Sequence, residues 1–248
     1  MKEGSKILWT DTVDSTQEEV KRQLQTLDNL SVIAALFQTA GKGQRGNKWS
    51  SGRGENLTFS LLLKPGSDGT APLKATDQFG ISILSAVAVK ELLLSKGVSC
   101  QIKWPNDIYV GNRKICGMLI ENRLDDNGMV ADSIIGIGIN VNQTVFPPEL
   151  VNPVSMAKIL KKDFDVKILL EEFVEIFRKL LYLPEGELKE KYLDGLYRLG
   201  CRAAYTDLIT GEEFQGVIRG INPVGKLIVE LSDGALKTFS FKEISYII

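Results

Sequence analysis

Cationic and amide side chains alternate with glycines in one short segment near the N-terminus. Residues 41–49 read GKGQRGNKW. Glycine lets the backbone turn several N–H groups toward one point and approach a ligand closely. Lysine and arginine beside it can hold the charge of a phosphate. The segment therefore predicts a loop that wraps around an anionic ligand.

Three other groups of polar residues could take part in the same chemistry. Ser15 and Glu18 match a helix capping box, although a helix N-terminus also offers free N–H groups to a ligand. Lys114 follows a tight turn, where a lysine is ordinarily a solvated surface residue. Asn140 ends the strand GIGIN, whose glycines allow close approach of a ligand. Residues 105–107, PND, form a turn by composition, and a turn and a site are compatible there.

Composition excludes several classes of protein. The chain of 248 residues contains no histidine, which removes Ser-His-Asp catalysis and histidine metal sites. Its 30 basic and 31 acidic residues disfavour binding to DNA or other polyanions. Three widely spaced cysteines, with no apolar signal region, predict buried reduced thiols in a cytoplasmic protein. No apolar run approaches membrane-spanning length, so no membrane contact is expected.

The elements that must position these residues mix strands and helices. The capping box predicts a helix from Ser15 to about Leu27. Apolar side chains recur at helical spacing over residues 77–96, which predicts a helix that ends at Gly97. Strands are expected at 7–9, 32–37, 57–63, 99–103, 108–110, 115–121 and 133–140, and further helices at 168–181 and 188–196. The successive βαβ units of a dinucleotide-binding fold are missing, so the fold class is α+β.

The pattern changes near residue 198. Short alternating segments follow, divided by turn sequences such as NPVG at 222–225. They predict a small, partly closed β-barrel. We therefore expect a catalytic domain over residues 1–197 and a barrel over residues 198–248.

Four sequence blocks, taken together and in order, resemble those of biotin protein ligases, also called biotin–[acetyl-CoA-carboxylase] ligases. The resemblance covers nearly the whole chain. It implies a mixed sheet with flanking helices, related to lipoate ligases and class II tRNA synthetases, plus a small C-terminal barrel. The blocks are DSTQ at 14–17, QTAGKGQRGNKW at 38–49, KWPND at 103–107 with RKICG at 113–117, and GIGINVN at 136–142.

The resemblance also implies an activity. Members of the family join biotin to ATP as biotinyl-5′-AMP, release pyrophosphate, and transfer biotin to a lysine of a biotin carboxyl carrier protein. The implied substrates are biotin and ATP with Mg²⁺, and the implied partner is the carrier of acetyl-CoA carboxylase or a related carboxylase. Because the chain begins at the first catalytic strand, we expect the monofunctional form, without an N-terminal DNA-binding domain. The particular carrier, the choice between monomer and homodimer, and the role of the barrel are left open.

The first reaction step sets a carboxylate against an α-phosphate, so cations and N–H donors must offset their repulsion. By resemblance, Lys114 touches both groups and Lys103 is the second catalytic lysine. Asp107 is a candidate ligand of Mg²⁺, which takes few protein ligands. The implied biotin contacts are Ser15, Thr16, Gln17, Gln38, Gly41, Lys42, Gly43, Gln44, Trp49, Lys114 and Gly117. The implied ATP contacts are Gln44, Arg45, Asn47, Lys103, Asn106, Asp107 and Asn140.

The glycine-rich segment departs from a pattern common among relatives, many of which have arginine at the positions of Lys42, Gln44 and Asn47. Gln44 cannot contribute a charge, so phosphate binding there would rest on Arg45, Lys48 or backbone N–H groups. Trp49 has two interpretations: it covers the thiophane ring of biotin, or it anchors the loop in the core.

Three other functions are weighed against biotin ligation. A lipoate or octanoate ligase of the same fold needs a long apolar tunnel, whereas the neutral ureido ring of biotin needs hydroxyls and amides such as Ser15, Thr16 and Gln38. A nucleic-acid-binding module is disfavoured by the near-neutral charge. A non-catalytic biotin-binding protein is disfavoured by the presence of Lys114.

Overall fold

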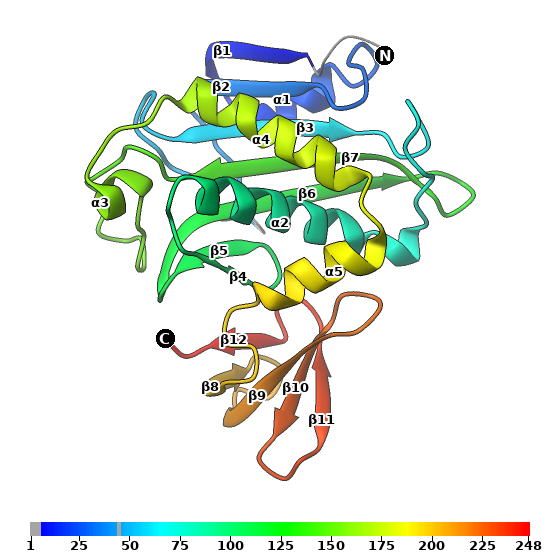
Figure 1. The fold of residues 1–248 in the computed structure, drawn as a ribbon, viewed down its shortest axis with the longest axis vertical. Coiled ribbons are helices and arrows are strands. Elements are labelled where there is room, and N and C mark those ends of the chain that lie inside the picture. The colour runs from blue at the N-terminus through cyan, green and yellow to red at the C-terminus, as the bar shows by residue number, and fades with distance from the viewer. Residues whose placement is uncertain (1–5, 44–45) are drawn as a thin grey trace.

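A seven-stranded mixed sheet forms the larger part of the molecule. The computed structural model describes residues 6–43 and 46–248 (Figure 1). The strand order is β1-β2-β3-β7-β6-β5-β4, with β1 and β2 parallel and every other pair antiparallel. The strands are β1 (Ile7–Val13), β2 (Val32–Gln38), β3 (Leu57–Leu63), β4 (Gln101–Lys103), β5 (Asp107–Val110), β6 (Arg113–Leu124) and β7 (Val130–Ile139).

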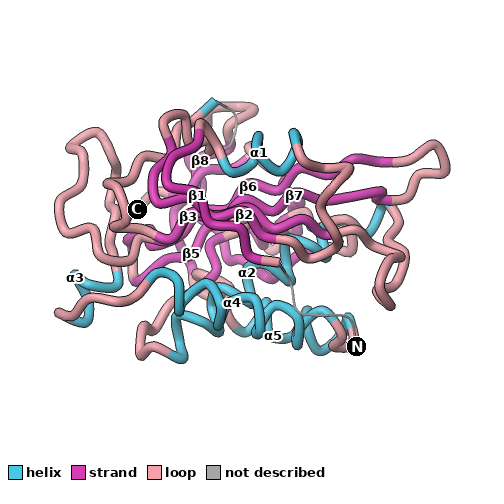
Figure 2. Tube along the Cα trace, turned by 90° about the horizontal axis from the view of Figure 1, so that it is seen from above, coloured by secondary structure: helices cyan, strands magenta, loops and turns pink. Residues whose placement is uncertain are grey.

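Helices cover the two faces of this sheet unequally. Helices α2, α4 and α5 lie on one face, and α1 lies on the other (Figure 2). Phe59 of β3 packs on Phe173 of the three-helix layer, with ring centroids 4.9 Å apart. Its neighbour Ser60 points the other way and bonds to α1. The helices are α1 (Thr16–Arg22), η2 (Ala75–Asp77), α2 (Phe79–Ser95), α3 (Met156–Leu160), α4 (Val166–Leu181) and α5 (Glu185–Asp194).

Helix α2 is apolar on nearly all sides because it packs against the sheet, α4 and α5. Within the described residues, Ala75–Ser95 is long and apolar enough to cross a membrane by length and composition alone, with a mean hydropathy of 1.4. This corrects the expectation that no apolar run approaches that length. Since 56% of the segment's 18-residue apolar window is buried inside the protein, its place in the core accounts for its composition.

The C-terminal residues form a second, antiparallel sheet of order β11-β10-β9-β8-β12. Its outer strands do not pair with each other, so the expected barrel is an open sheet among the described strands. One hydrophobic core runs through both sheets and includes Tyr205 and Phe239. The strands are β8 (Arg202–Asp207), β9 (Glu213–Ile221), β10 (Leu227–Leu231), β11 (Leu236–Phe239) and β12 (Ile244–Tyr246).

Predictions for α1, α5 and the cysteines differ from the structure. Helix α5 spans Glu185–Asp194 and not 188–196, so it begins and ends earlier than expected. Helix α1 ends at Arg22 and not near Leu27, because the chain then tightens into turns in which the Thr26 hydroxyl donates to the Gln23 carbonyl. Two cysteines are buried as expected, but Cys201 is exposed.

Candidate active site

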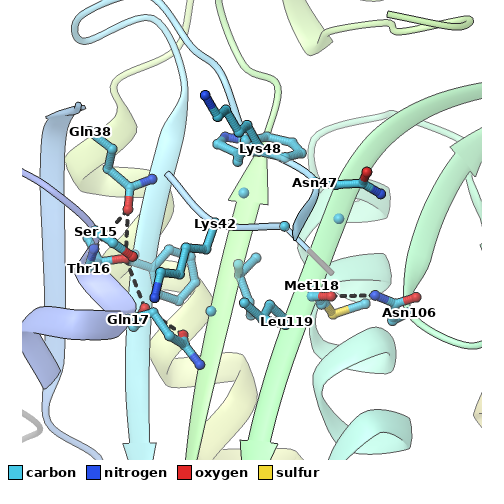
Figure 3. A pocket seen from close by; sticks show the side chains of 18 of the residues that line it. Ser15, Thr16, Gln17, Gln38, Lys42, Asn47, Lys48, Asn106, Met118 and Leu119 are labelled. Carbon is cyan, nitrogen blue, oxygen red and sulfur yellow. Dashed lines mark hydrogen bonds between the residues drawn. The ribbon is translucent and has the colours of Figure 1, made fainter. Parts of the chain in front are cut away.

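A pocket opens on the face of the sheet that carries α1 (Figure 3). The start of α1, the end of β2, the glycine-rich segment and strands β3, β7 and β6 surround it. Its lining includes twelve of the residues expected at the site: Ser15, Thr16, Gln17, Gln38, Lys42, Gly43, Asn47, Trp49, Asn106, Asp107, Lys114 and Gly117.

Neutral hydrogen-bonding groups gather at one end of the pocket. The Gln38 Oε1 atom accepts from the Thr16 backbone N–H at 2.8 Å and from its hydroxyl at 3.2 Å. The hydroxyls of Thr16 and Ser60 lie 2.9 Å apart. The hydroxyl of Ser15 does not bond to its own helix. This end offers uncharged donors and acceptors to a ligand.

Gln17 holds α1 onto the sheet beneath this end. Its amide donates to the Glu121 carboxylate at 2.9 Å and to the Ile134 carbonyl at 3.0 Å, while its Oε1 atom accepts from Ser60 at 3.1 Å. Gln17 therefore lines the pocket but uses both ends of its amide to fix the neighbouring groups.

Lys114 provides a cation at the other end. Its Nζ lies 2.7 Å from the Asp107 Oδ1 atom. Its backbone N–H donates to the Asn152 carbonyl at 2.9 Å, and its carbonyl accepts from the Val154 N–H at 2.9 Å. The Asn140 side chain holds the segment that pairs with Lys114, because its amide donates to the Val154 carbonyl at 3.1 Å. The backbone that carries Lys114 is thus held on both sides.

The glycine-rich segment closes on itself across the pocket mouth. The Trp49 N–H donates to the Gly41 carbonyl at 2.9 Å, and the Gly43 N–H donates to the Asn47 carbonyl at 2.7 Å. Lys42 is tied to α1, since its Nζ lies 2.7 Å from the Glu18 carboxylate. That hydrogen bond, with a second from Lys21, lowers the pKa of Glu18.

Trp49 lies on the floor of the pocket, against glycines of two strands. A Cβ atom at Gly138 would fall less than 3.0 Å from its ring. A Cβ atom at Gly117 would fall 3.4 Å from it. The Trp49 Nε1 atom is buried and has no hydrogen-bond partner among the described residues. Trp49 therefore anchors the segment and also faces the pocket, so both interpretations of this residue stand.

Comparison with known proteins identifies this arrangement. The model of the biotin/lipoate A/B protein ligase family matches residues 9–140. The bifunctional ligase/repressor BirA of Bacillus subtilis is 31% identical over 96% of this chain and 73% of its own length. The chain belongs to the biotin/lipoate A/B protein ligase family.

A solved structure and a further sequence relative agree with this membership. The biotin protein ligase from Aquifex aeolicus, in complex with biotin and ATP, matches with a TM-score of 0.75 and 27% identity over 97% of each chain. BirA of Escherichia coli is 29% identical over 98% of this chain and 74% of its own length. The similarity therefore extends through the C-terminal sheet as well as the family domain.

Three of the described residues expected at the site of this ligase do not line the pocket. Gly41 lies just outside it, bonded to Trp49. Asn140 is 5% exposed and bonds to backbone carbonyls, so it supports the wall. Lys103 lies near the C-terminal sheet, and its ammonium faces two tyrosine rings. Gln44 and Arg45 fall outside the described residues, and their expected roles stay predictions.

The pocket of this ligase also contains residues that sequence reasoning missed. Ser60 supplies a hydroxyl at the neutral end, and Leu119 lies on the floor. Ser60 is 0% exposed within a strand whose other side chains are almost all apolar. The sequence could have indicated Ser60 as a site residue, because a buried hydroxyl in an apolar strand needs a hydrogen-bond partner.

The described pocket lining offers one carboxylate, that of Asp107, as a protein ligand for a magnesium ion. In the part of the chain that the structure describes, no group of three or more acidic, cysteine or histidine side chains is arranged so that it could hold a metal ion. Asp107 is a carboxylate in the lining, and one of its oxygens already faces Lys114. A single carboxylate suits Mg²⁺ that is held mainly by phosphates and water.

Proposed function

We propose that this chain is an ATP-dependent biotin–protein ligase that forms biotinyl-5′-AMP and transfers biotin to a lysine of a carrier protein. Its family membership and its relatives named biotin–protein ligase support this function. The observation that carries it is one pocket with two chemical ends. Ser15, Thr16 and Gln38 form a neutral end, and Lys114 forms a cationic end.

The neutral end suits the ureido ring of biotin, which is polar but uncharged. Gln38 and the hydroxyls of Thr16 and Ser60 already form a connected hydrogen-bond network. Such a network holds its members in place before the ligand arrives, which favours binding. A lipoyl chain has no polar group to satisfy these donors and acceptors.

The cationic end suits adenylate formation. An oxygen of the biotin carboxylate attacks the α-phosphorus of ATP, a P–O bond to the β-phosphate breaks, and pyrophosphate leaves. Negative charge gathers on the phosphoryl oxygens during this step, and Lys114 stabilises it there. Asp107 keeps the Lys114 ammonium in place through its 2.7 Å contact. No proton need be moved by the protein.

Transfer to the carrier starts from biotinyl-5′-AMP, in which the biotin carboxyl group and the phosphate form a mixed anhydride. The neutral amine of the acceptor lysine attacks the biotinyl carbonyl carbon, the carbon–oxygen bond to phosphate breaks, AMP leaves, and the proton of the amine passes to solvent. Mg²⁺ would stay with the phosphates and offset their charge, with Asp107 as its candidate protein ligand. A biotin carboxyl carrier protein as the acceptor, a cytoplasmic location, and function without DNA or membrane are parts of this proposal.

Incubation with ATP, Mg²⁺ and biotin tests the proposal. We expect biotin-dependent release of pyrophosphate and retention of biotinyl-5′-AMP by the protein, and then biotin on a single lysine of an added carrier domain. Lipoate in place of biotin is the matched control and should give neither product. Equal pyrophosphate release with lipoate would contradict the biotin assignment.

A further inference from the structure

Lys103 connects the two sheets of the molecule. Its Nζ atom lies 5.0 Å from the ring centroid of Tyr109 and 4.6 Å from that of Tyr246. Tyr109 belongs to β5 of the large sheet, whereas Tyr246 belongs to β12 of the C-terminal sheet. One ammonium group therefore contacts aromatic rings from both parts of the protein.

Aromatic rings are in direct contact with the Lys103 ammonium. Among the described residues, no carboxylate lies within ion-pair distance of the Lys103 ammonium. Burial lowers the pKa of Lys103; Lys114 and Arg198 lower it further, and Asp107 opposes them. Attraction between a cation and an aromatic face is strongest where water is excluded. Loss of either ring would leave a buried charge poorly compensated.

Asp107 links Lys103 to the catalytic lysine, Lys114. Lys103 and Asp107 are partners across the β4–β5 pair. Asp107 in turn lies 2.7 Å from the Lys114 ammonium. A displacement of Lys103 would therefore move the strand ends that carry Asp107.

A third tyrosine strengthens the same connection. The Tyr197 ring lies 5.6 Å from that of Tyr109 and 5.9 Å from that of Tyr246. Its hydroxyl bonds to the Asn112 side chain at 2.7 Å, in the turn that precedes Lys114. The aromatic cluster thus contacts the β5–β6 hairpin close to Lys114.

We propose that Lys103 is a positioning residue whose ammonium, held between Tyr109 and Tyr246, fixes Asp107 and thereby Lys114 for adenylate formation. The C-terminal sheet then contributes to the first reaction step through the ring of Tyr246. This inference rests on the proposed ligase function and adds a role for two residues that lie outside the pocket.

Two pairs of variants test the inference by biotin-dependent pyrophosphate release. Lys103→Met removes the charge, and Lys103→Arg keeps it. Tyr246→Leu removes the ring, whereas Tyr246→Phe keeps it and deletes a buried hydroxyl that has no hydrogen-bond partner among the described residues. We expect kcat to fall on the order of tenfold in the Met and Leu variants, as for a slightly misplaced catalytic group. The KM for biotin should stay within about twofold of wild type, because the neutral end is untouched.

Rescue by the conservative variants is the decisive comparison. Lys103→Arg and Tyr246→Phe should retain kcat within about twofold, with thermal unfolding confirming that each variant is folded at the assay temperature. If Lys103→Met does not fold, the Tyr246 pair decides alone. Equal kcat in Tyr246→Leu and Tyr246→Phe would overturn the inference, as would a raised KM for ATP with unchanged kcat in Lys103→Met. Wild-type protein without pyrophosphate release would instead overturn the proposed function, and this inference with it.

Discussion

The hydroxyl of Ser15 shows how far single residues could be predicted. The sequence leaves two roles for Ser15: a capping box, in which Ser15 and Glu18 bond to each other's backbone N–H groups, and contact with a ligand. The structure keeps Ser15 at the N-cap but gives its side chain no bond to the helix, and Glu18 pairs with Lys21 and Lys42 instead. A local pattern cannot predict this outcome, because it depends on Lys42, which is distant in sequence. The alternative role of Ser15, contact with a ligand, is the one that its position allows.

Replacement of Ser15 by alanine should separate these two roles. Loss of an N-cap bond usually costs about 1 kcal/mol, but here we expect a change in the free energy of unfolding below about 0.5 kcal/mol. The Kd for biotin should rise about fivefold, as for one lost hydrogen bond of about 1 kcal/mol. Denaturant unfolding and isothermal titration provide the two measurements.

Asp165→Ala is the control for Ser15. Asp165 caps α4 by accepting from the Lys167 N–H at 2.7 Å, so its loss should destabilise the protein by about 1 kcal/mol and leave biotin affinity unchanged. Equal destabilisation by both variants, with wild-type biotin affinity, would assign Ser15 a purely structural role.

Lys114→Ala tests the charge at the other end of the pocket. The side chain is half-buried and its backbone bonds remain, so the fold should be nearly intact. Turnover should fall on the order of a hundredfold or more, because the charge on the transferring phosphoryl group loses its stabilising cation. The exposed neighbour Arg113, changed to alanine, should keep wild-type pyrophosphate release. A fully active Lys114→Ala variant would remove the catalytic assignment.

At the scale of elements, the strands were more predictable than the ends of the helices. The expected strand at 57–63 is β3 as observed, because its apolar composition persists to both ends. Helix α1 ends earlier than expected, because side-chain bonds in the following turn compete with the helix. The glycines of β7 were expected to admit a ligand. The structure shows that Gly138 also admits the ring of Trp49.

Gly138→Ala should therefore lift the glycine-rich segment from the strand. The new methyl group would overlap the Trp49 ring, and overpacking of this kind costs about 1–3 kcal/mol. We expect a raised KM for biotin together with faster proteolysis in the segment. Gly186→Ala in α5 is the matched control, because a Cβ atom there meets nothing within 4 Å. Identical KM values for the two variants would show that Trp49 packing does not shape the pocket.

At the scale of the whole molecule, a second sheet could be predicted but its openness could not. Turn sequences after residue 198 predict short strands, whereas closure of a barrel requires its first and last strands to pair across the whole unit. The two sheets meet where Gly225 faces Phe79 of α2, and the Trp104 indole N–H donates to the Gly225 carbonyl at 2.9 Å. These contacts join residues far apart in sequence.

Gly225→Ala should weaken this junction. Gly225 has a φ of 82°, and a Cβ atom there would lie less than 3.0 Å from the Phe79 ring. Gly234 has a φ of 86° with nothing within 4 Å, so Gly234→Ala carries the backbone strain without the overlap. We expect the midpoint of thermal unfolding to fall further for Gly225→Ala, by about 2–4 °C for each kcal/mol lost. Equal midpoints would show that the Phe79 contact contributes no stability.

A crystal structure of the chain with biotinyl-5′-AMP tests the account most directly. We predict the ureido ring within hydrogen-bond distance of Ser15, Thr16 and Gln38, and the phosphate beside the Lys114 ammonium. A second cavity lies between the two sheets, lined in part by Trp104 and Phe241. An adenylate bound in that cavity, with the pocket at Lys114 empty, would contradict the account.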